Sequence, residues 1–436
     1  MKKLLSVSLI VLIFILTLTA CNNDETVTER VTLYTVEGAW LLGGSWIYDY
    51  NKNADYYADT IDIITFESDE ALKEKLSSEL MAGKGPDLIL DSTMLMAELS
   101  DQKLIETDSF LDLNKLDLDL NDYSQNILDN TLVDGKRIYI PAYYTPKFWI
   151  CSEEDLEGIQ SGDVLSYDEL IKLSESTDKK LFSESDYASW FALYYVQDSI
   201  DFDNKSFNFD SEKFKSTVEN LRKMNDIEKA KSGEEYIFST YASSPYDIYA
   251  KFAEIENEGK TPAIVGEPSL NEKLSAYFTD AIFVNKNCDK NKFDKVKKII
   301  EFVVSEGVQN ETTGAEISQY NPLFSYTSGI LFPTNAKSFE TLMNSAYSFS
   351  YNTSGEYEPN GSSKPRTDEP QTVISDKSKK LLHDKLNSIE QFQLGNYYVR
   401  YNIIVQDIIE EYYNGNITTD KLISQLSSKT KIFLEE

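Results

Sequence analysis

The sequence of 436 residues is poor in the side chains on which most catalytic and metal sites depend. It has one histidine, His383, and three cysteines, Cys21, Cys151 and Cys288. A single histidine excludes two-histidine metal sites and the HExxH motif, and the cysteines lack zinc-binding spacing. Walker A, GxGxxG and GxSxG motifs are also absent from the sequence. We therefore expect no metal, no cofactor and no nucleotide or hydrolase motif.

Basic residues are few relative to acidic ones. The chain has 42 Lys and Arg against 73 Asp and Glu, which gives a formal net charge of −31. Such a surface repels phosphate backbones, so nucleic-acid binding is not expected, and a strongly anionic ligand is disfavoured. Hydrophobic residues at 41% and charged residues at 26% indicate a folded chain. The 28 tyrosines exceed what a core needs, which indicates surfaces that stack on a flat ligand.

The N-terminus gives an expected location. Residues 1–3 (MKK) are positive and residues 4–20 are apolar, broken by Ser and Thr. The alternative is an N-terminal anchor helix, but residues 18–21 (LTAC) resemble the lipobox of bacterial lipoproteins. The resemblance implies a signal peptide over 1–20 and lipidation of Cys21. Residues 21–30 are then a polar tether at the outer face of the cell membrane.

Local patterns predict an α/β chain. Residues 31–36 and 61–66 are β-branched and aromatic, as in strands. Ser68 caps a helix whose apolar residues recur every four positions, and residues 88–90 form a short buried strand. A fourth strand is expected over 136–140. Alternating strands and helices predict a parallel sheet with crossover helices.

A second α/β region follows in the sequence. Ser166 and Glu169 have the spacing of a capping box. Further elements are expected in this order: a helix capped by Asp210, a strand over 262–265, a helix from Phe293 to Gly307, a polar loop over 352–371, and helices over 377–392, over 397–413 and from Thr418 or Thr419 to Phe433.

Short motifs in a fixed order resemble a known family. Residues 80–91 (LMAGKGPDLILD) are similar to the extracellular solute-binding proteins of ABC importers, in their maltose-binding-like, family 1 carbohydrate branch. Further segments that resemble this family are 135–141 (GKRIYIP), 166–170 (SYDEL), 264–268 (IVGEP), the helix leading to Gln309, 332–335 (FPTN) and 413–436. Together they span nearly all of 31–436. Residues 148–151 (FWIC) depart from the family pattern, where many members have Tyr-Asn-Lys.

The resemblance implies a two-lobe α/β fold of the type II periplasmic-binding-protein kind, with crossing strands as a hinge. Lobe one would comprise 31–142 and 262–320, and lobe two 143–261 and 321–436. Ligand would bind in the cleft as the lobes close on it. The implied partners are a small-molecule ligand, a sugar above all, and the ABC permease subunits. We expect a monomer that catalyses no reaction and meets the membrane only through its lipid anchor.

Candidate ligand-binding residues lie after strands or near the hinge. Glu37, Trp40 and Trp46 follow the first strand, where a carboxylate can accept hydroxyl hydrogen bonds and an indole can stack on a sugar ring. One of these tryptophans could instead be core. Asp91 ends the third strand, where it is a ligand contact or a helix cap.

Four more candidates lie further along the chain. Tyr144 is at the predicted hinge, where it stacks on ligand or simply packs, and Glu267 follows a strand. Trp190 has helical spacing that is more typical of a core residue, and Tyr320 precedes a long connection.

Other features have ordinary explanations. Residues 117–128 begin like a calcium loop but lack the required Gly and Glu, so they are read as acidic surface. His383 is expected on the surface or in packing, and pairing of Cys151 with Cys288 stays open. The alternative functions are the same fold with a peptide, polyamine or other metabolite, a surface glycosidase with paired carboxylates, or an interaction protein without a small ligand.

Overall fold

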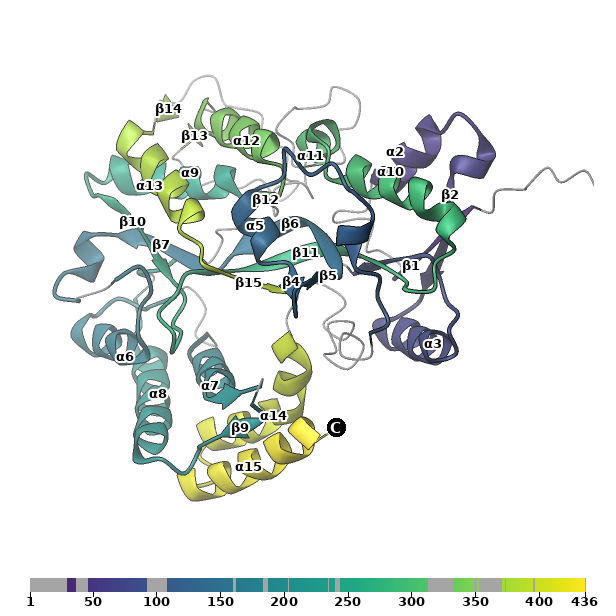
Figure 1. The fold of residues 1–436 in the computed structure, drawn as a ribbon. Coiled ribbons are helices and arrows are strands. Elements are labelled where there is room, and N and C mark those ends of the chain that lie inside the picture. Colours follow the sequence, from purple (N-terminus) through teal and green to yellow (C-terminus); the bar gives the residue numbers. More distant parts are fainter. Residues whose placement is uncertain are drawn as a thin grey trace, which may run out of the picture.

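A computed structural model describes most of the chain (Figure 1). The described residues are 30–36, 46–91, 108–159, 162–182, 187–202, 204–233, 235–239, 244–312, 332–348, 351–352, 371–372, 374–394 and 397–435. Several predictions fall outside them: the signal peptide, nearly all of the tether with Cys21, the candidates Glu37, Trp40 and Tyr320, and most of the 352–371 loop.

The first sheet begins with the three strands expected from the sequence. Strands β1 (Val31–Val36), β2 (Ile61–Phe66) and β3 (Leu88–Asp91) are parallel, with β1 between the other two. Helix α3 (Asp69–Met81) connects β2 to β3, and the Ser68 side chain accepts the Ala71 N–H at its start. Its apolar stripe is buried in the core. These predictions are confirmed.

Four later strands complete this sheet and make it mixed. They are β6 (Tyr139–Pro146), β11 (Ser275–Val284), β12 (Phe332–Pro333) and β15 (Gln391–Leu394). The order is β12-β6-β11-β3-β1-β2, and β15 pairs with β11. Because β11 is antiparallel to both β3 and β6, the parallel sheet expected from the sequence is only partly correct.

Two expected elements have different boundaries. The strand predicted over 136–140 is divided, because β4 (Leu132–Val133) and β5 (Lys136–Arg137) form a hairpin before β6 begins. Its turn, Asp134–Gly135, has positive φ angles at both residues, as tight hairpins require. The helix predicted over 377–392 ends at Asn387 as α13 (Asp376–Asn387), because residues 391–394 pair with β11 as a strand.

A second, smaller sheet contains β7 (Phe148–Ser152) and β10 (Pro262–Gly266), which are antiparallel. Single bridges extend it through the pairs Ile150–Ser239, Val164–Gly266 and Lys180–Tyr236. Strand alternation sends β7 side chains to two cores. Phe148 and Ile150 join the first core, and Trp149 and Cys151 join the second.

Helices cover both faces of the second sheet. Helix α9 (Pro245–Asn257) packs on β7 and β10, α13 packs on β10, and α12 (Ala336–Ser348) packs on α9. The other core contains α6 (Tyr167–Ser176), α7 (Tyr187–Asp198), α8 (Glu212–Ala230), α14 (Tyr397–Tyr413) and α15 (Thr419–Glu435). Helices α7, α8, α14 and α15 stand together at the bottom of Figure 1.

Helix starts follow local capping chemistry. The predicted capping box at Ser166 and Glu169 is confirmed. The α8 cap is Ser211 rather than the expected Asp210, since the Ser211 hydroxyl accepts the Phe214 N–H. The helix expected to reach Gly307 is divided into α10 (Phe293–Val303) and α11 (Glu306–Thr312).

The remaining elements are short. They are α2 (Trp46–Asn53), α5 (Gln125–Asp129), the hairpin of β8 (Ile200–Asp201) and β9 (Ser206–Phe207), and the pair β13 (Tyr351–Asn352) and β14 (Gln371–Thr372). Three-residue 3-10 helices occur at Tyr57–Asp59, Leu113–Lys115, Glu154–Leu156 and Lys290–Lys292. Helices α2 and α10 lie on one side of β1 and β2, and α3 lies on the other (Figure 1). Within the described residues, no helix is both long and apolar enough to cross a membrane.

The chain crosses between the two sheets along neighbouring segments. Strand β6 of the first sheet continues into β7 of the second through Lys147 alone. In the opposite direction, β10 of the second sheet continues into β11 of the first through residues 267–274. The fold is therefore the two-lobe α/β fold expected from the sequence. The exact lobe boundaries remain a prediction.

Candidate functional site

The candidate site lies where the two sheets join. Lys147 is fixed there by backbone hydrogen bonds to the other crossing segment. Its N–H donates to the Ser275 carbonyl oxygen at 2.8 Å, and its carbonyl oxygen accepts from the Glu267 N–H at 3.2 Å. The side chains of Lys147 and Glu267 are thus held side by side at the junction.

The Lys147 ammonium is enclosed by aromatic rings and a carboxylate. Its Nζ lies 4.7 Å from the centre of the Tyr277 ring and 5.7 Å from that of Tyr194. It is 3.7 Å from a carboxylate oxygen of Glu267, and its side chain is 18% exposed. Burial by itself lowers the pKa of Lys147, but Tyr277, Glu267 and Tyr194 more than offset that effect and raise the pKa above its usual value. Lys147 therefore stays charged.

Helix α7 presents one face to this junction. Trp190, Tyr194 and Asp198 are spaced by four residues, which places them along one side of the helix. The adjacent side contributes Phe191 and Tyr195 to the second core, against which Tyr194 also packs. The Trp190 side chain is 42% exposed. An exposed indole one turn from Tyr194 offers a flat apolar surface beside charged groups.

Asp198 links α7 to the crossing segment. Its carboxylate accepts the Tyr167 hydroxyl at 2.8 Å and the Leu270 N–H at 3.2 Å. Burial raises the pKa of Asp198, and the Tyr167 hydrogen bond and the Lys147 charge partly oppose that shift. The junction therefore contains one lysine and the carboxylates of Glu267 and Asp198.

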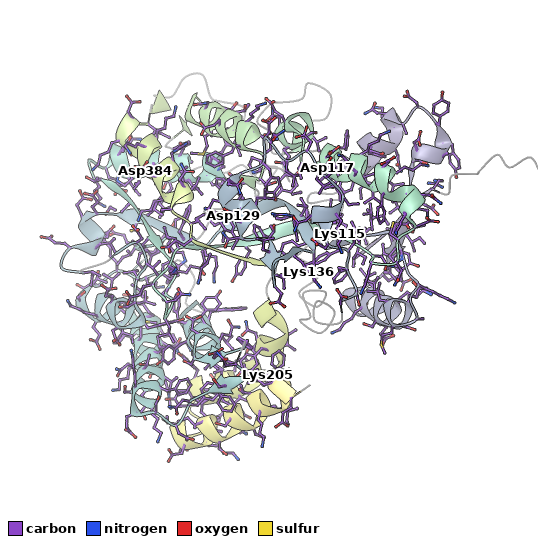
Figure 2. The ribbon with its side chains drawn as sticks, viewed as in Figure 1. Lys115, Asp117, Asp129, Lys136, Lys205 and Asp384 are labelled. Atoms are coloured by element: carbon purple, nitrogen blue, oxygen red, sulfur yellow. The ribbon has the colours of Figure 1, made fainter. Side chains whose placement is uncertain are left out.

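A pocket of about 520 Å³ lies at the end of α7. Asp198 and Leu270 line it together with Tyr195, Phe214 and Lys213. Asp198 is thus shared between this pocket and the junction. Figure 2 helps to place these parts: Lys205 marks the β8–β9 turn near the pocket, and Lys136 marks the β4–β5 hairpin of the first lobe.

The structure separates the predicted candidates into groups. Glu267 lies at the junction, and the exposed Trp190 lies one helical turn from Tyr194 on the same side of α7. Trp46 is buried in the first core, which matches the alternative that one of the first tryptophans is core. Tyr144 is also buried, and its ring centre lies 5.5 Å from that of Phe332 and 5.6 Å from that of Phe392. Neither Trp46 nor Tyr144 therefore has an exposed ring face.

Asp91 lies at the carboxyl end of a strand, where ligand-binding residues are expected. It is the last residue of β3 and pairs with Ala281 of β11. The neighbouring Asp280 is buried and has a φ of 52°, a left-handed conformation in the middle of a strand. Non-glycine residues rarely adopt it, and such strained positions concentrate at ligand sites. Asp280 therefore joins the candidates at the carboxyl edge of the sheet.

Sequence reasoning missed Lys147, Tyr194, Tyr277, Asp198 and Asp280. One signal was available: Lys147 is the single charged residue between Ile138 and Cys151. A lone cation within an apolar strand run indicates a specific partner, because burying an unpaired charge is costly.

The structure also shows the surroundings of the two later cysteines and of the single histidine. Cys151 and Cys288 are both free and buried, so the open alternative of a disulfide between them is wrong. Burial raises the pKa of the Cys288 thiol to about 12, which keeps it protonated. His383 contacts Glu340 and Asn387 on the outside of α13, as expected for a surface residue. Among the residues that the structure describes, no cluster of three His, Cys, Asp or Glu side chains could hold a metal ion.

No protein-family model and no curated protein matches the sequence. Solved structures do match. The sugar-binding protein MalE from Xanthomonas citri is 15% identical, with a TM-score of 0.54 over 93% of this chain and 97% of that one. A periplasmic oligogalacturonide-binding protein from Yersinia enterocolitica is 15% identical, with a TM-score of 0.53 over 93% and 99%. The cyclic α-maltosyl-1,6-maltose-binding protein from Arthrobacter globiformis is 11% identical, with a TM-score of 0.52 over 93% and 98%.

At these identities the likeness concerns the fold. It extends over 93% of the chain. The chain has the two-lobe α/β fold of the maltose-binding-like solute-binding proteins.

Proposed function

We propose that the chain is the lipid-anchored, extracellular solute-binding component of an ABC importer, and that it captures a carbohydrate or oligosaccharide. The observation that supports this most directly is the exposed Trp190 on α7, one helical turn from Tyr194, whose ring contacts Lys147 beside Glu267. Lobes that close on a sugar need side chains at the junction that stack on the ring or form hydrogen bonds with its hydroxyls. Three of the structurally similar proteins are sugar-binding proteins.

The chemistry of the junction suits a neutral, hydroxyl-rich ligand. An exposed indole stacks on the C–H face of a sugar ring. The Glu267 carboxylate accepts hydroxyl hydrogen bonds, and the lysine ammonium donates them. The Lys147 charge is already balanced by Glu267, so the junction offers no unpaired cation to an anion.

The test is ligand binding by wild type and by Trp190→Ala. A thermal-shift screen with maltotriose, oligogalacturonide and spermidine comes first, since a ligand of the native state raises the melting temperature. For the sugar that binds, calorimetry should show at least about tenfold weaker binding by Trp190→Ala, which corresponds to about 1.4 kcal/mol. The control is Ile432→Ala, because Ile432 is an exposed apolar side chain on α15.

Three outcomes would contradict this proposal. Unchanged sugar affinity in Trp190→Ala would remove the junction as the binding site. Binding of spermidine but of no sugar would favour the alternative cargo. Release of new reducing ends from an oligosaccharide would instead support the glycosidase alternative, in which two carboxylates act on the bound sugar.

A further inference from the structure

Two adjacent tyrosines stand out on the surface of the first lobe. Tyr56 is 72% exposed and Tyr57 is 76% exposed, whereas the next most exposed aromatic residue of the described region, Trp190, is 42% exposed. They take no part in the junction between the lobes. Scattered exposed apolar residues are normal, but two neighbouring aromatic rings that both point outward are not required by the fold.

The turn that carries these rings is firmly held. The Asp59 N–H donates to the Tyr56 carbonyl oxygen at 2.9 Å, and the Thr60 N–H donates to the Tyr57 carbonyl oxygen at 3.2 Å. From α10, the Lys295 ammonium donates to the Ala58 carbonyl oxygen at 2.6 Å. The exposure of the two rings is therefore built into a fixed turn.

The N-terminal segment joins the body at the same place. Arg30, the first described residue, lies over the Tyr57 ring at 4.5 Å and donates to the Tyr57 hydroxyl at 2.8 Å. It also donates to the Ile61 carbonyl oxygen at 2.8 Å and pairs with Asp62 at 3.2 Å. These contacts fix the point where the chain leads back toward Cys21.

The length of that segment limits how far the rings can move from a lipid on Cys21. Arg30 is nine residues after Cys21. Fully extended, nine residues span about 30 Å, and as a flexible chain they span about 16 Å on average. Tyrosine rings favour the interface between lipid and water, where the hydroxyl stays hydrated and the ring is buried.

Local charge also suits a membrane surface. The chain as a whole is strongly acidic, so most of its surface is repelled by anionic lipid. At this turn, however, Arg30 pairs with Asp62, and Lys295 lies 3.5 Å from Asp59. Lys52 and Asp55, both exposed just before the rings in the chain, add one charge of each sign, so the charges of these six residues sum to zero.

We propose that Tyr56 and Tyr57 form a membrane contact that enters the headgroup layer beside the anchor. The proposal rests on the lipid anchor of the proposed function. A second contact next to the anchor fixes which side of the body faces the lipid, whereas attachment through Cys21 alone does not determine it. The partner is the lipid surface itself.

The experiment supplies the lipid chemically, so it does not depend on lipidation in the cell. The chain from Cys21 onward is coupled through Cys21 to a maleimide lipid in phosphatidylcholine–phosphatidylglycerol vesicles. Cys151 and Cys288 are buried, so Cys21 is the thiol that reacts. Hydroxyl-radical footprinting then compares this sample with the same chain coupled to a soluble maleimide. We expect Tyr56 and Tyr57 to be modified at least threefold more slowly on vesicles.

The internal control is Met81, which is 86% exposed at the end of α3 and should be modified equally in both samples. Equal modification of the tyrosines in both samples would overturn the proposal. That result would also show that any partner for these rings is not lipid.

A second measurement uses single-chain maleimide lipid, which anchors only marginally and so reveals weak additional contacts. We expect Tyr56→Ser/Tyr57→Ser to lower the vesicle-bound to free ratio at least threefold, while Tyr236→Ser/Ile432→Ser, at exposed positions elsewhere, leaves it unchanged. An unchanged ratio in the first variant would contradict the proposal. Absence of lipid on Cys21 in cells would instead count against the proposed function and leave the vesicle result intact.

Discussion

Lys147 gives the most direct test of how the two lobes are joined. We expect Lys147→Met to lower the free energy of unfolding, because methionine keeps the aliphatic length but loses the charge. The two ring contacts, at 4.7 and 5.7 Å, are each worth about 0.5–1 kcal/mol at partly exposed positions. The ion pair with Glu267, at 3.7 Å, adds about 0–1 kcal/mol. The expected loss is about 1–3 kcal/mol.

Urea unfolding followed by circular dichroism measures this loss. A change in midpoint with an unchanged slope reports stability alone. Lys147→Arg, which keeps the charge, should lose less than Lys147→Met. Lys431→Met is the matched surface control, because that lysine is exposed on α15. A Lys147→Met midpoint equal to that of wild type would refute the assignment of stabilising contacts to this ammonium.

The pH dependence follows from the raised pKa of Lys147. A base whose pKa is higher in the folded state stabilises the fold at every pH below its unfolded pKa, about 10.4 for lysine. That stability is lost as the pH rises through the folded pKa. The difference between wild type and Lys147→Met should therefore be constant from pH 6 to about 9.5 and shrink only in stronger base. A difference that shrinks near neutral pH would contradict this reasoning.

Two further substitutions test packing and buried charge. Gly266→Ala should lower the free energy of unfolding by about 1–3 kcal/mol, because a Cβ there would lie 2.7 Å from Val164 and 2.8 Å from Leu274. The control is Gly307→Ala, since a Cβ at that position meets open space. Equal urea midpoints for the two variants would contradict the prediction. Glu228→Gln should lower the free energy of unfolding by about 3 kcal/mol, because the buried carboxylate accepts hydrogen bonds from the Leu181 N–H, the Ser174 hydroxyl and the Lys231 ammonium. Glu212→Gln on the same helix should lower it by less than about 0.5 kcal/mol, because Glu212 is exposed. A comparable loss in both variants would refute the role of burial.

The sequence was most informative where structure is determined locally. Residues 31–36, 61–66 and 88–90 are strands as predicted, and Ser68 and Ser166 cap their helices. These elements depend on side-chain periodicity and on hydrogen bonds within one turn, both of which are visible in a short window. The two-lobe fold was also predicted, from the order of several short motifs.

Long-range contacts could not be predicted in the same way. Residues 391–394 continue a helical pattern, yet they form β15 because β11 offers backbone partners more than a hundred residues earlier in the chain. Tyr144 and Lys147 lie three residues apart near the hinge, and strand alternation directs them to opposite surroundings: Tyr144 to a buried aromatic cluster and Lys147 to the junction. Which of the two faces the junction depends on register, which is set by tertiary packing.

The buried, unpaired thiols of Cys151 and Cys288 bear on where this chain can fold. Because no cross-link between them helps to hold the lobes, reductants should leave the fold intact, and oxidising conditions are not needed to reach it. A version that begins at Cys21 should therefore fold without an oxidising compartment. Because Cys151 and Cys288 are both buried, a reagent for exposed thiols should leave these two unmodified, so that a label, a surface or a lipid can be directed to Cys21.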